Sequence, residues 1–373
     1  MKKHSKSQQN PKGPANQACP PMAGSITIGI DLGDKTSRYC VLNPQGEVAK
    51  QSSVAMTRKA VAQTFGAMPR SRIALEVGTH SPWVSRLLSS LGHEVIVANP
   101  RQLRLITESS RKDDKVDAKT LARLARIDPE LLRPIRHRGE KAQMALMQIR
   151  VRAALVESRT SLVNTLRGLA KSVGDRVASC DPDSLDGSRL EGLAKPLQQV
   201  LEPLVEQVAS LTTQIQQCDR KLEQIARDEY PETELLTQVY GVGTLIALTF
   251  VLTVEDPQRF HKSRDVGCYV GLRPKRSQSG QSDPQLRITK EGDRYLRQML
   301  VQGAHCILSK RSPDTDLKRW GLKLGARGGQ NAKKRAIVAV ARKLAILLHR
   351  LWVTGEVYEP LRNQPAGSGR QAA

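Results

Sequence analysis

Aromatic residues are scarce in this chain of 373 residues, which has three Trp, six Tyr and three Phe. Little side-chain material is therefore present for stacking on unpaired bases. The six cysteines form no C-x-x-C pair and the seven histidines are dispersed, which argues against a zinc site or a disulfide framework. No Walker A pattern occurs, so the sequence offers no P-loop for a nucleotide.

Long apolar runs are also missing. The longest, over residues 244–254, is too short to cross a bilayer. Residues 1–24 are polar and lack the apolar core of a signal peptide. Since no disulfide pattern is present either, we expect a soluble protein of the reducing cytoplasm with no membrane partner.

Acidic residues are in the minority, because 36 Asp and Glu stand against 59 Lys and Arg, for a net charge of +23. The excess is uneven: it is +4 over 1–24, +8 over 25–139, −3 over 140–234, +14 over 235–355 and zero over 356–373. We predict that these segments are a disordered basic leader, an α/β domain, a coiled-coil domain, a mainly helical C-terminal domain and a tail. Two basic bodies flank a near-neutral one, which indicates that the outer two face nucleic acid and the middle one faces protein.

The segment 25–139 alternates predicted strands and helices. Strands are expected at 26–31, at 38–42, briefly near Val48, at 72–76 and at 94–98, and helices at 59–65, at 82–91, from near Arg101 and at 114–126. Antiparallel strands followed by alternating helix and strand predict a three-layer α/β domain of the RNase H type.

A coiled coil is predicted within 140–234. Apolar residues recur at alternating spacings of four and three along one helix, at Leu204, Val208, Leu211, Ile215, Cys218, Leu222 and Ile225. Pro203 should kink this helix or mark its start. An earlier helix over 141–171 has a similar register, and the pair could form an antiparallel hairpin or zip with another protomer.

Four carboxylates are the candidate catalytic groups. Asp31 and Glu76 each end a predicted apolar strand, and on neighbouring strands roughly 4.8 Å apart both could address one metal position. Asp114 and Asp117 lie one turn apart on one helix face, although either alone could be an N-terminal acid favoured by the helix dipole. Four such oxygen donors suit Mg²⁺, and acids gathered in a cationic protein point to metal-assisted phosphodiester chemistry.

Neighbouring residues leave alternatives open. The strand ending at Asp31 also resembles the first phosphate loop of actin-like ATPases, but no second Gly-rich loop follows. Asp113 competes with Asp114. His80, four residues after Glu76, could relay a proton, but a surface or supporting role fits it better.

The C-terminal body carries the densest positive charge. Its Y-G-V-G-T segment at 240–244 resembles the Gly turn of helix-hairpin-helix modules, whose backbone N–H groups can meet a phosphate. Its basic residues exceed what solubility requires. The candidates for nucleic-acid binding are Arg273, Lys275, Arg276, Arg287, Lys290, Arg294, Arg297, Lys333, Lys334 and Arg335.

These motifs together resemble the DEDD transposases of insertion sequences, the IS110 family of bridge-RNA-guided recombinases. In the first domain the resemblance lies in G-I-D-L-G, A-L-E-V-G-T-H and D-K-V-D-A-K-T-L-A. In the last domain it lies in Y-G-V-G-T, Y-V-G-L-R-P, S-Q-S-G and I-T-K-E-G-D-R-Y-L-R. It covers nearly all of residues 26–352.

The resemblance implies a RuvC-like domain holding Mg²⁺ on the four acids, a coiled-coil insertion and a C-terminal transposase domain. It also implies that Ser279 is a nucleophile that joins covalently to DNA. From the residues alone Ser279 is a turn serine, with Ser277 and Ser282 as competitors. The implied partners are donor and target DNA, a structured guide RNA, and further copies of the chain in a dimer or tetramer assembled through the coiled coil.

Two other functions fit the same residues. A Holliday-junction resolvase or nuclease would use the four acids and a water in place of the serine. A non-catalytic nucleic-acid-binding protein would use the acids only structurally.

Overall fold

The computed structural model describes residues 26–99, 114–284 and 286–363, without the side chains of residues 114 and 115. The chain divides into two compact units, Met1–Arg138 and Gly139–Ala373. The expected leader, the helix from Arg101, Asp113 and most of the tail lie outside the described residues. In the described part no helix is both long enough and apolar enough to span a membrane.

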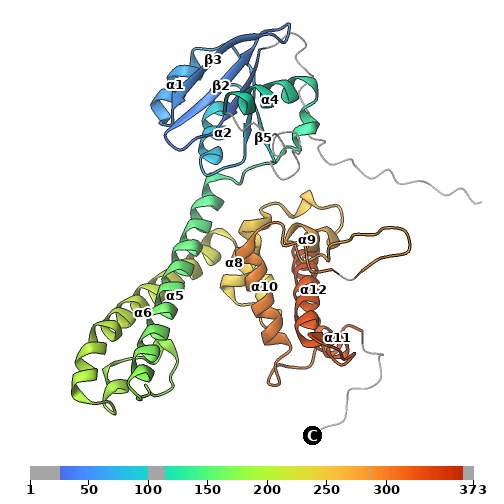
Figure 1. Cartoon of the computed structure of the whole chain (residues 1–373). Coiled ribbons are helices and arrows are strands. Elements are labelled where there is room, and N and C mark those ends of the chain that lie inside the picture. Colours follow the sequence, from blue (N-terminus) through green and yellow to red (C-terminus); the bar gives the residue numbers. More distant parts are fainter. Residues whose placement is uncertain (1–25, 100–113, 285, 364–373) are drawn as a thin grey trace, which may run out of the picture. The chain divides into compact units, whose positions relative to one another are not determined.

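A five-stranded sheet forms the first unit (Figure 1). Its strands are β1 (Thr27–Asp31), β2 (Thr36–Leu42), β3 (Val48–Ala55), β4 (Arg72–Glu76) and β5 (Glu94–Ala98), in the order β3-β2-β1-β4-β5. The first three strands pair antiparallel, and β1, β4 and β5 pair parallel. The predicted RNase H-like α/β fold is confirmed, although β3 is a full strand of eight residues and not a short one.

Helices cover both faces of this sheet. On one face, Val61 and Phe65 of α1 (Arg58–Gly66) and Val84 and Leu88 of α2 (Ser81–Ser90) pack against strand residues such as Leu75. On the other face, α4 (Asp114–Ile127) packs on side chains that include Ala74, Ile96, Cys40 and Leu42. Successive strand residues point to opposite faces, which produces the three layers.

Gly29 in the middle of β1 lets α4 approach the sheet closely. A Cβ atom at this position would lie 2.0 Å from the carbonyl oxygen of Ala118 and 2.6 Å from the amide nitrogen of Ala122, both on α4. Only a residue without a side chain fits there. This contact sets the depth at which α4, and with it Asp117, lies over the sheet.

The second unit begins with a helical hairpin made of α5 (Glu140–Ser172) and α6 (Lys195–Glu229). The two helices run antiparallel, because Arg152 pairs with Asp219 at 2.8 Å, while Lys141, earlier in α5, pairs with Glu229, later in α6, at 3.3 Å. Of the predicted seam residues, Val208, Leu211, Ile215 and Leu222 are buried. The coiled coil therefore folds within one chain.

The expectation for Pro203 was wrong in part. Helix α6 begins at Lys195 and runs through Pro203. The carbonyl that loses its hydrogen bond to a proline four residues on belongs to Gln199, which is exposed, so water can take the place of the missing donor.

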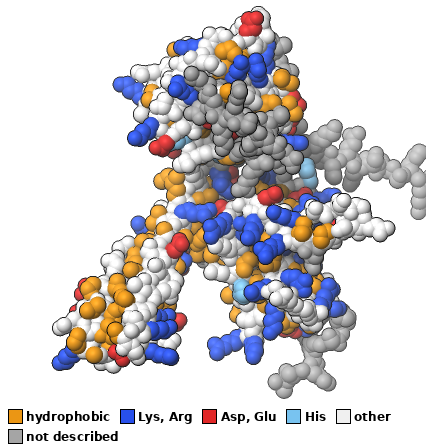
Figure 2. Space-filling view, in the orientation of Figure 1, with side chains coloured by type: hydrophobic (Ala, Val, Ile, Leu, Met, Phe, Trp, Pro, Cys, Tyr) orange, Lys and Arg blue, Asp and Glu red, His pale blue; other side chains and the backbone are white. Residues whose placement is uncertain are grey.

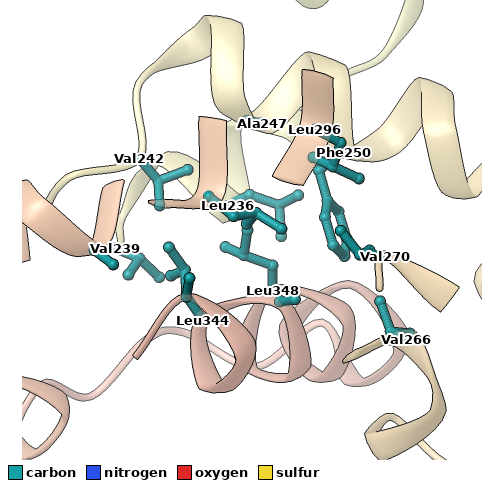
Figure 3. Packing of buried hydrophobic residues seen from close by; sticks show 14 of the residues in the cluster. Leu236, Val239, Val242, Ala247, Phe250, Val266, Val270, Leu296, Leu344 and Leu348 are labelled. Atoms are coloured by element: carbon teal, nitrogen blue, oxygen red, sulfur yellow. The ribbon is translucent and has the colours of Figure 1, made fainter. Parts of the chain in front are cut away.

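The rest of the unit is a helical body built around one long helix. It comprises α7 (Glu232–Thr237), α8 (Thr244–Val254), α9 (Arg264–Tyr269), α10 (Arg294–Ile307), α11 (Asp316–Gly325) and α12 (Ala332–Thr354). Figure 3 shows Leu344 and Leu348 of α12 pointing into a core that contains Leu236, Val242 and Phe250. The α5–α6 hairpin joins this body through α8, whose Leu248 and Leu252 pack with Ile149 and Leu222.

Candidate active site

Asp31 and Glu76 lie side by side at the edge of the sheet. Strands β1 and β4 are parallel neighbours, with Ile30 opposite Leu75 as their last registered pair. Asp31 follows Ile30 and is the last residue of β1. Glu76 follows Leu75 and is the last residue of β4. Both are half-buried, so they are screened from solvent on the sheet side and open towards a ligand.

Asp117, on α4, lies near Glu76. It precedes Ala118, whose backbone packs against Gly29 two residues before Asp31. Burial raises the pKa of the Glu76 carboxyl, and the nearby Asp117 carboxylate raises that pKa further. The repulsion indicates that the two carboxylates are neighbours.

Asp114 begins α4, one turn before Asp117. Its side chain lies outside the described part of the chain. Its predicted role therefore stays a prediction.

Ser279 lies at the tip of a β-hairpin in the second unit. The two sides of this hairpin meet at its base through an isolated bridge between Pro274 and Ile288, and beside it the amide of Lys275 donates to the carbonyl oxygen of Arg287 at 2.9 Å. At its tip, Ser279 and Ser282 exchange backbone hydrogen bonds of 3.1 and 3.0 Å around Gly280, whose φ is +55°. The tip is a two-residue turn with glycine at its first central position, and the side chain of Ser279 beside it is exposed.

Most of the predicted nucleic-acid-binding side chains are exposed. Arg273, Lys275, Arg276, Arg287 and Lys290 flank the hairpin, and Arg294 opens α10. On the face drawn in Figure 2, Lys and Arg side chains gather over the C-terminal body and acidic side chains are sparse. Arg297 differs, because its Nη1 donates to the carbonyl oxygens of Val270 and Glu291, both at 2.9 Å, and so braces the base of the hairpin.

Lys333, Lys334 and Arg335 lie in the first turn of α12, as predicted. The N-terminus is the positive end of the helix dipole, so cations are disfavoured there and anions are stabilised. Asn331, the N-cap residue, has a φ of +65° and makes no side-chain capping hydrogen bond. This end of α12 therefore carries three adjacent cations, and its predicted role in nucleic-acid binding stays a prediction.

Two family models match the chain. Residues 28–174 match the IS110-type DEDD transposase, and residues 233–318 match the transposase of the IS116/IS110/IS902 family. Together they span more than half of the sequence; the first contains the four candidate acids and the second contains Ser279. The chain belongs to the IS110 family of DEDD transposases.

Relatives of this IS110-family transposase match it over nearly their whole length. It is 27% identical to the transposase for insertion sequence element IS1111A of Coxiella burnetii, over 89% of this chain and 90% of the relative. It is 28% identical to the putative transposase y4pF/y4sB of Sinorhizobium fredii, over 94% and 89%. It is 26% identical to a probable family 20 transposase of Pseudomonas aeruginosa, over 89% and 98%.

DEDD enzymes use a divalent metal, and the carboxylate site of the transposase fits one. Half-buried Glu76 beside Asp117, with Asp31 at the adjacent strand end, supplies hard oxygen donors whose mutual repulsion a cation would relieve. Among the described side chains no three Asp, Glu, His or Cys residues are grouped tightly enough to hold a metal. The predicted fourth ligand, Asp114, has its side chain outside the described part of the chain, so its role stays a prediction.

His80 belongs to a small cluster with Trp83 and Asp34. Trp83 Nε1 donates to His80 Nδ1 at 3.0 Å, and His80 Nε2 lies 3.6 Å from Asp34. With Nδ1 accepting, a neutral His80 carries its proton on Nε2, towards Asp34. The sequence signal for this cluster was a Trp three residues after the histidine at a helix start, which places both rings on one face.

Proposed function

We propose that this transposase cleaves, exchanges and rejoins DNA strands for its insertion sequence through a covalent intermediate on Ser279. The observation that carries the proposal is that Asp31 and Glu76 end adjacent strands at one sheet edge, with Asp117 of α4 near enough to Glu76 to raise its pKa, in a strongly cationic chain. Such a group has a physical purpose where a cation must be held against a phosphate.

Asp31, Glu76, Asp114 and Asp117 would hold Mg²⁺. When bound, the ion would neutralise charge on the phosphate and favour attack on phosphorus. The four carboxylates set the charge of the site, and the half-buried position of Glu76 limits the access of water.

The serine would act as the nucleophile. Its Oγ forms a bond to phosphorus as the bond to one sugar oxygen breaks, the hydroxyl proton passes to solvent, and the released sugar oxygen takes up a proton. In the reverse step a sugar hydroxyl of the exchanged strand attacks the phosphoserine and Ser279 regains its proton. Two phosphodiester-type bonds of similar energy are exchanged, so no nucleotide is consumed.

A structured RNA would select the donor and target DNA. The scarcity of aromatic residues supports this part of the proposal, since the protein carries few side chains that could stack on and read unpaired bases. Base pairing would then read the sequence, while the basic surfaces hold backbones.

The test is a search for the adduct. The protein is purified with RNA transcribed from the flanks of its gene, incubated with donor DNA and Mg²⁺, and resolved under denaturing conditions, with the modified peptide identified by mass spectrometry. We expect an adduct at Ser279 that persists in Ser277→Ala and Ser282→Ala and is lost in Ser279→Ala and Asp31→Asn.

Two results would replace the proposal. DNA nicking that survives Ser279→Ala would indicate a hydrolytic resolvase or nuclease. Unchanged function in Asp31→Asn without a need for Mg²⁺ would indicate a non-catalytic nucleic-acid-binding protein.

A further inference from the structure

Arg342 of α12 has no protein partner for its charge among the described residues. Its Nε nitrogen is buried and makes no hydrogen bond. Burying such a donor without an acceptor is unfavourable, and an anion bound by the other guanidinium nitrogens would offset this cost by pairing with the charge. An arginine held in this way is a candidate ligand-binding group.

The position of Arg342 is enforced by a glycine. A Cβ atom on Gly267 of α9 would lie 3.0 Å from Cγ of Arg342 and 3.2 Å from its Nε. The arginine stem therefore lies flat across α9 where that helix has no side chain. Packing of this kind orients the guanidinium before any ligand arrives.

Arg342 lines a cleft of about 570 Å³ between α9, α12 and the hairpin that carries Ser279. Arg264 of α9 lines the same cleft, is exposed, and has no hydrogen bond or ion pair in the described part of the chain. The other cations of the cleft are Arg273, Lys275 and Arg276. Its two carboxylates are Asp265 and Asp283, and Asp283 lies 3.7 Å from Arg276.

Arg264 and Arg342 also line a second, larger groove that runs along α11 and α12. The basic side chains of that groove include Arg287, Lys290, Arg327, Lys334, Arg335 and Lys343. Arg264 and Arg342 thus line both the cleft and the groove. A continuous track of cations fits a chain of phosphates better than it fits one small anion.

We propose that Arg264 and Arg342 clamp one phosphodiester of a nucleic-acid strand in the cleft beneath the Ser279 hairpin. Two guanidinium forks suit the paired oxygens of a phosphate, and neither was among the basic residues predicted from the sequence. The inference rests on the proposed handling of nucleic acid by this body. It does not depend on the chemistry proposed for Ser279.

The test measures binding without reaction. Full-length protein is titrated in EDTA against fluorescent single-stranded DNA, the matching duplex and the matching RNA, over a range of NaCl concentrations. Variants are Arg264→Gln, Arg342→Gln and the double variant. The matched control is Arg319→Gln, because Arg319 is exposed on α11, pairs with Asp314 and lines neither the cleft nor the groove.

We expect the double variant to lose about tenfold or more in affinity for at least one probe, and the slope of log affinity against log salt to fall by about 1 to 2. Arg319→Gln should retain the affinity. The probe that suffers the loss identifies the strand that occupies the cleft.

Two further variants cover a failure of Arg342→Gln to fold. Arg342→Lys keeps the charge but loses the fork, and should weaken binding while the salt slope is retained. Arg264→Gln alone changes an exposed residue and should weaken binding severalfold. Thermal unfolding monitors the fold of each variant.

A folded double variant with unchanged affinity and salt slope for all three probes would overturn the inference. An equal loss in Arg319→Gln would do the same, because the effect would then be one of net charge. The two proposals can fail separately. If the double variant loses binding but the wild-type protein never forms a Ser279 adduct, the proposed chemistry is refuted and the phosphate clamp is supported.

Discussion

The protonation of Glu76, a candidate metal ligand, affects the stability of the first unit. Burial and the Asp117 carboxylate raise its pKa in the folded state. As the pH increases, Glu76 loses its proton in the unfolded chain before it does so in the folded protein. The free energy of unfolding therefore falls between the pKa of the unfolded chain and the raised pKa of the folded protein. Above both values the protein carries the full penalty of the buried charge.

We predict that Glu76→Gln stabilises the metal-free protein at neutral pH, because an uncharged amide removes the repulsion with Asp117. Thermal unfolding in EDTA should show a higher Tm than that of the wild type near pH 7, and this gain should shrink as the pH falls below about 4.

Addition of Mg²⁺ should reverse the order. Wild-type Tm should rise through binding to the folded state, while Glu76→Gln should respond little. Glu47→Gln, at an exposed position, serves as the control and should respond as the wild type does. Equal stabilisation of Glu76→Gln and wild type by Mg²⁺ would remove Glu76 from the metal site.

At the scale of elements, the α5–α6 hairpin depends on matched charges as well as on its apolar seam. Arg152 bonds to Asp219 through two nitrogens, at 2.8 and 3.2 Å, from a partly buried position. The pairing is specific to the antiparallel register, because a shift of one turn would separate the two side chains.

We predict that Arg152→Glu destabilises the protein by roughly 1–2 kcal/mol, since it sets two carboxylates against each other. The double variant Arg152→Glu/Asp219→Arg should recover most of that loss. Denaturant unfolding provides the measurement, with Arg227→Glu on the exposed face of α6 as the control. No recovery in the double variant would argue against the hairpin register.

At the scale of the whole molecule, the candidate acids and the candidate nucleophile belong to different units. Asp31, Glu76 and Asp117 lie in the first unit, and Ser279 lies in the second. The proposed reaction therefore requires that both act on one phosphodiester, and we propose that two different protomers supply them.

We predict that Asp31→Asn and Ser279→Ala, each inactive alone, restore strand exchange when they are mixed. We expect a yield below that of the wild type, since only some mixed assemblies combine an intact acid group with an intact serine. Recombination assayed on donor and target plasmids gives the yield. A mixture as inactive as each variant would mean that one protomer supplies both parts.

Most elements could be read from local sequence. The strands ending at Asp31 and Glu76 and the helices α4, α5 and α12 follow from apolar periods and turn residues that act over a few positions. The eight-residue β3 was underestimated, because its polar residues are exposed on an edge strand and give little apolar signal.

Sequence alone determined which groups exist: two acids at strand ends, two on one helix, a serine in a turn, and a large excess of cations in the last body. Tertiary structure decided which of them meet. Gly29 admits α4 and so brings Asp117 to Glu76, the apolar seam closes within one chain, and Gly267 lets Arg342 reach a cleft shared with Arg264. These contacts join residues far apart in the chain, and no local period records them, because long-range packing is selected by the shape of the whole core.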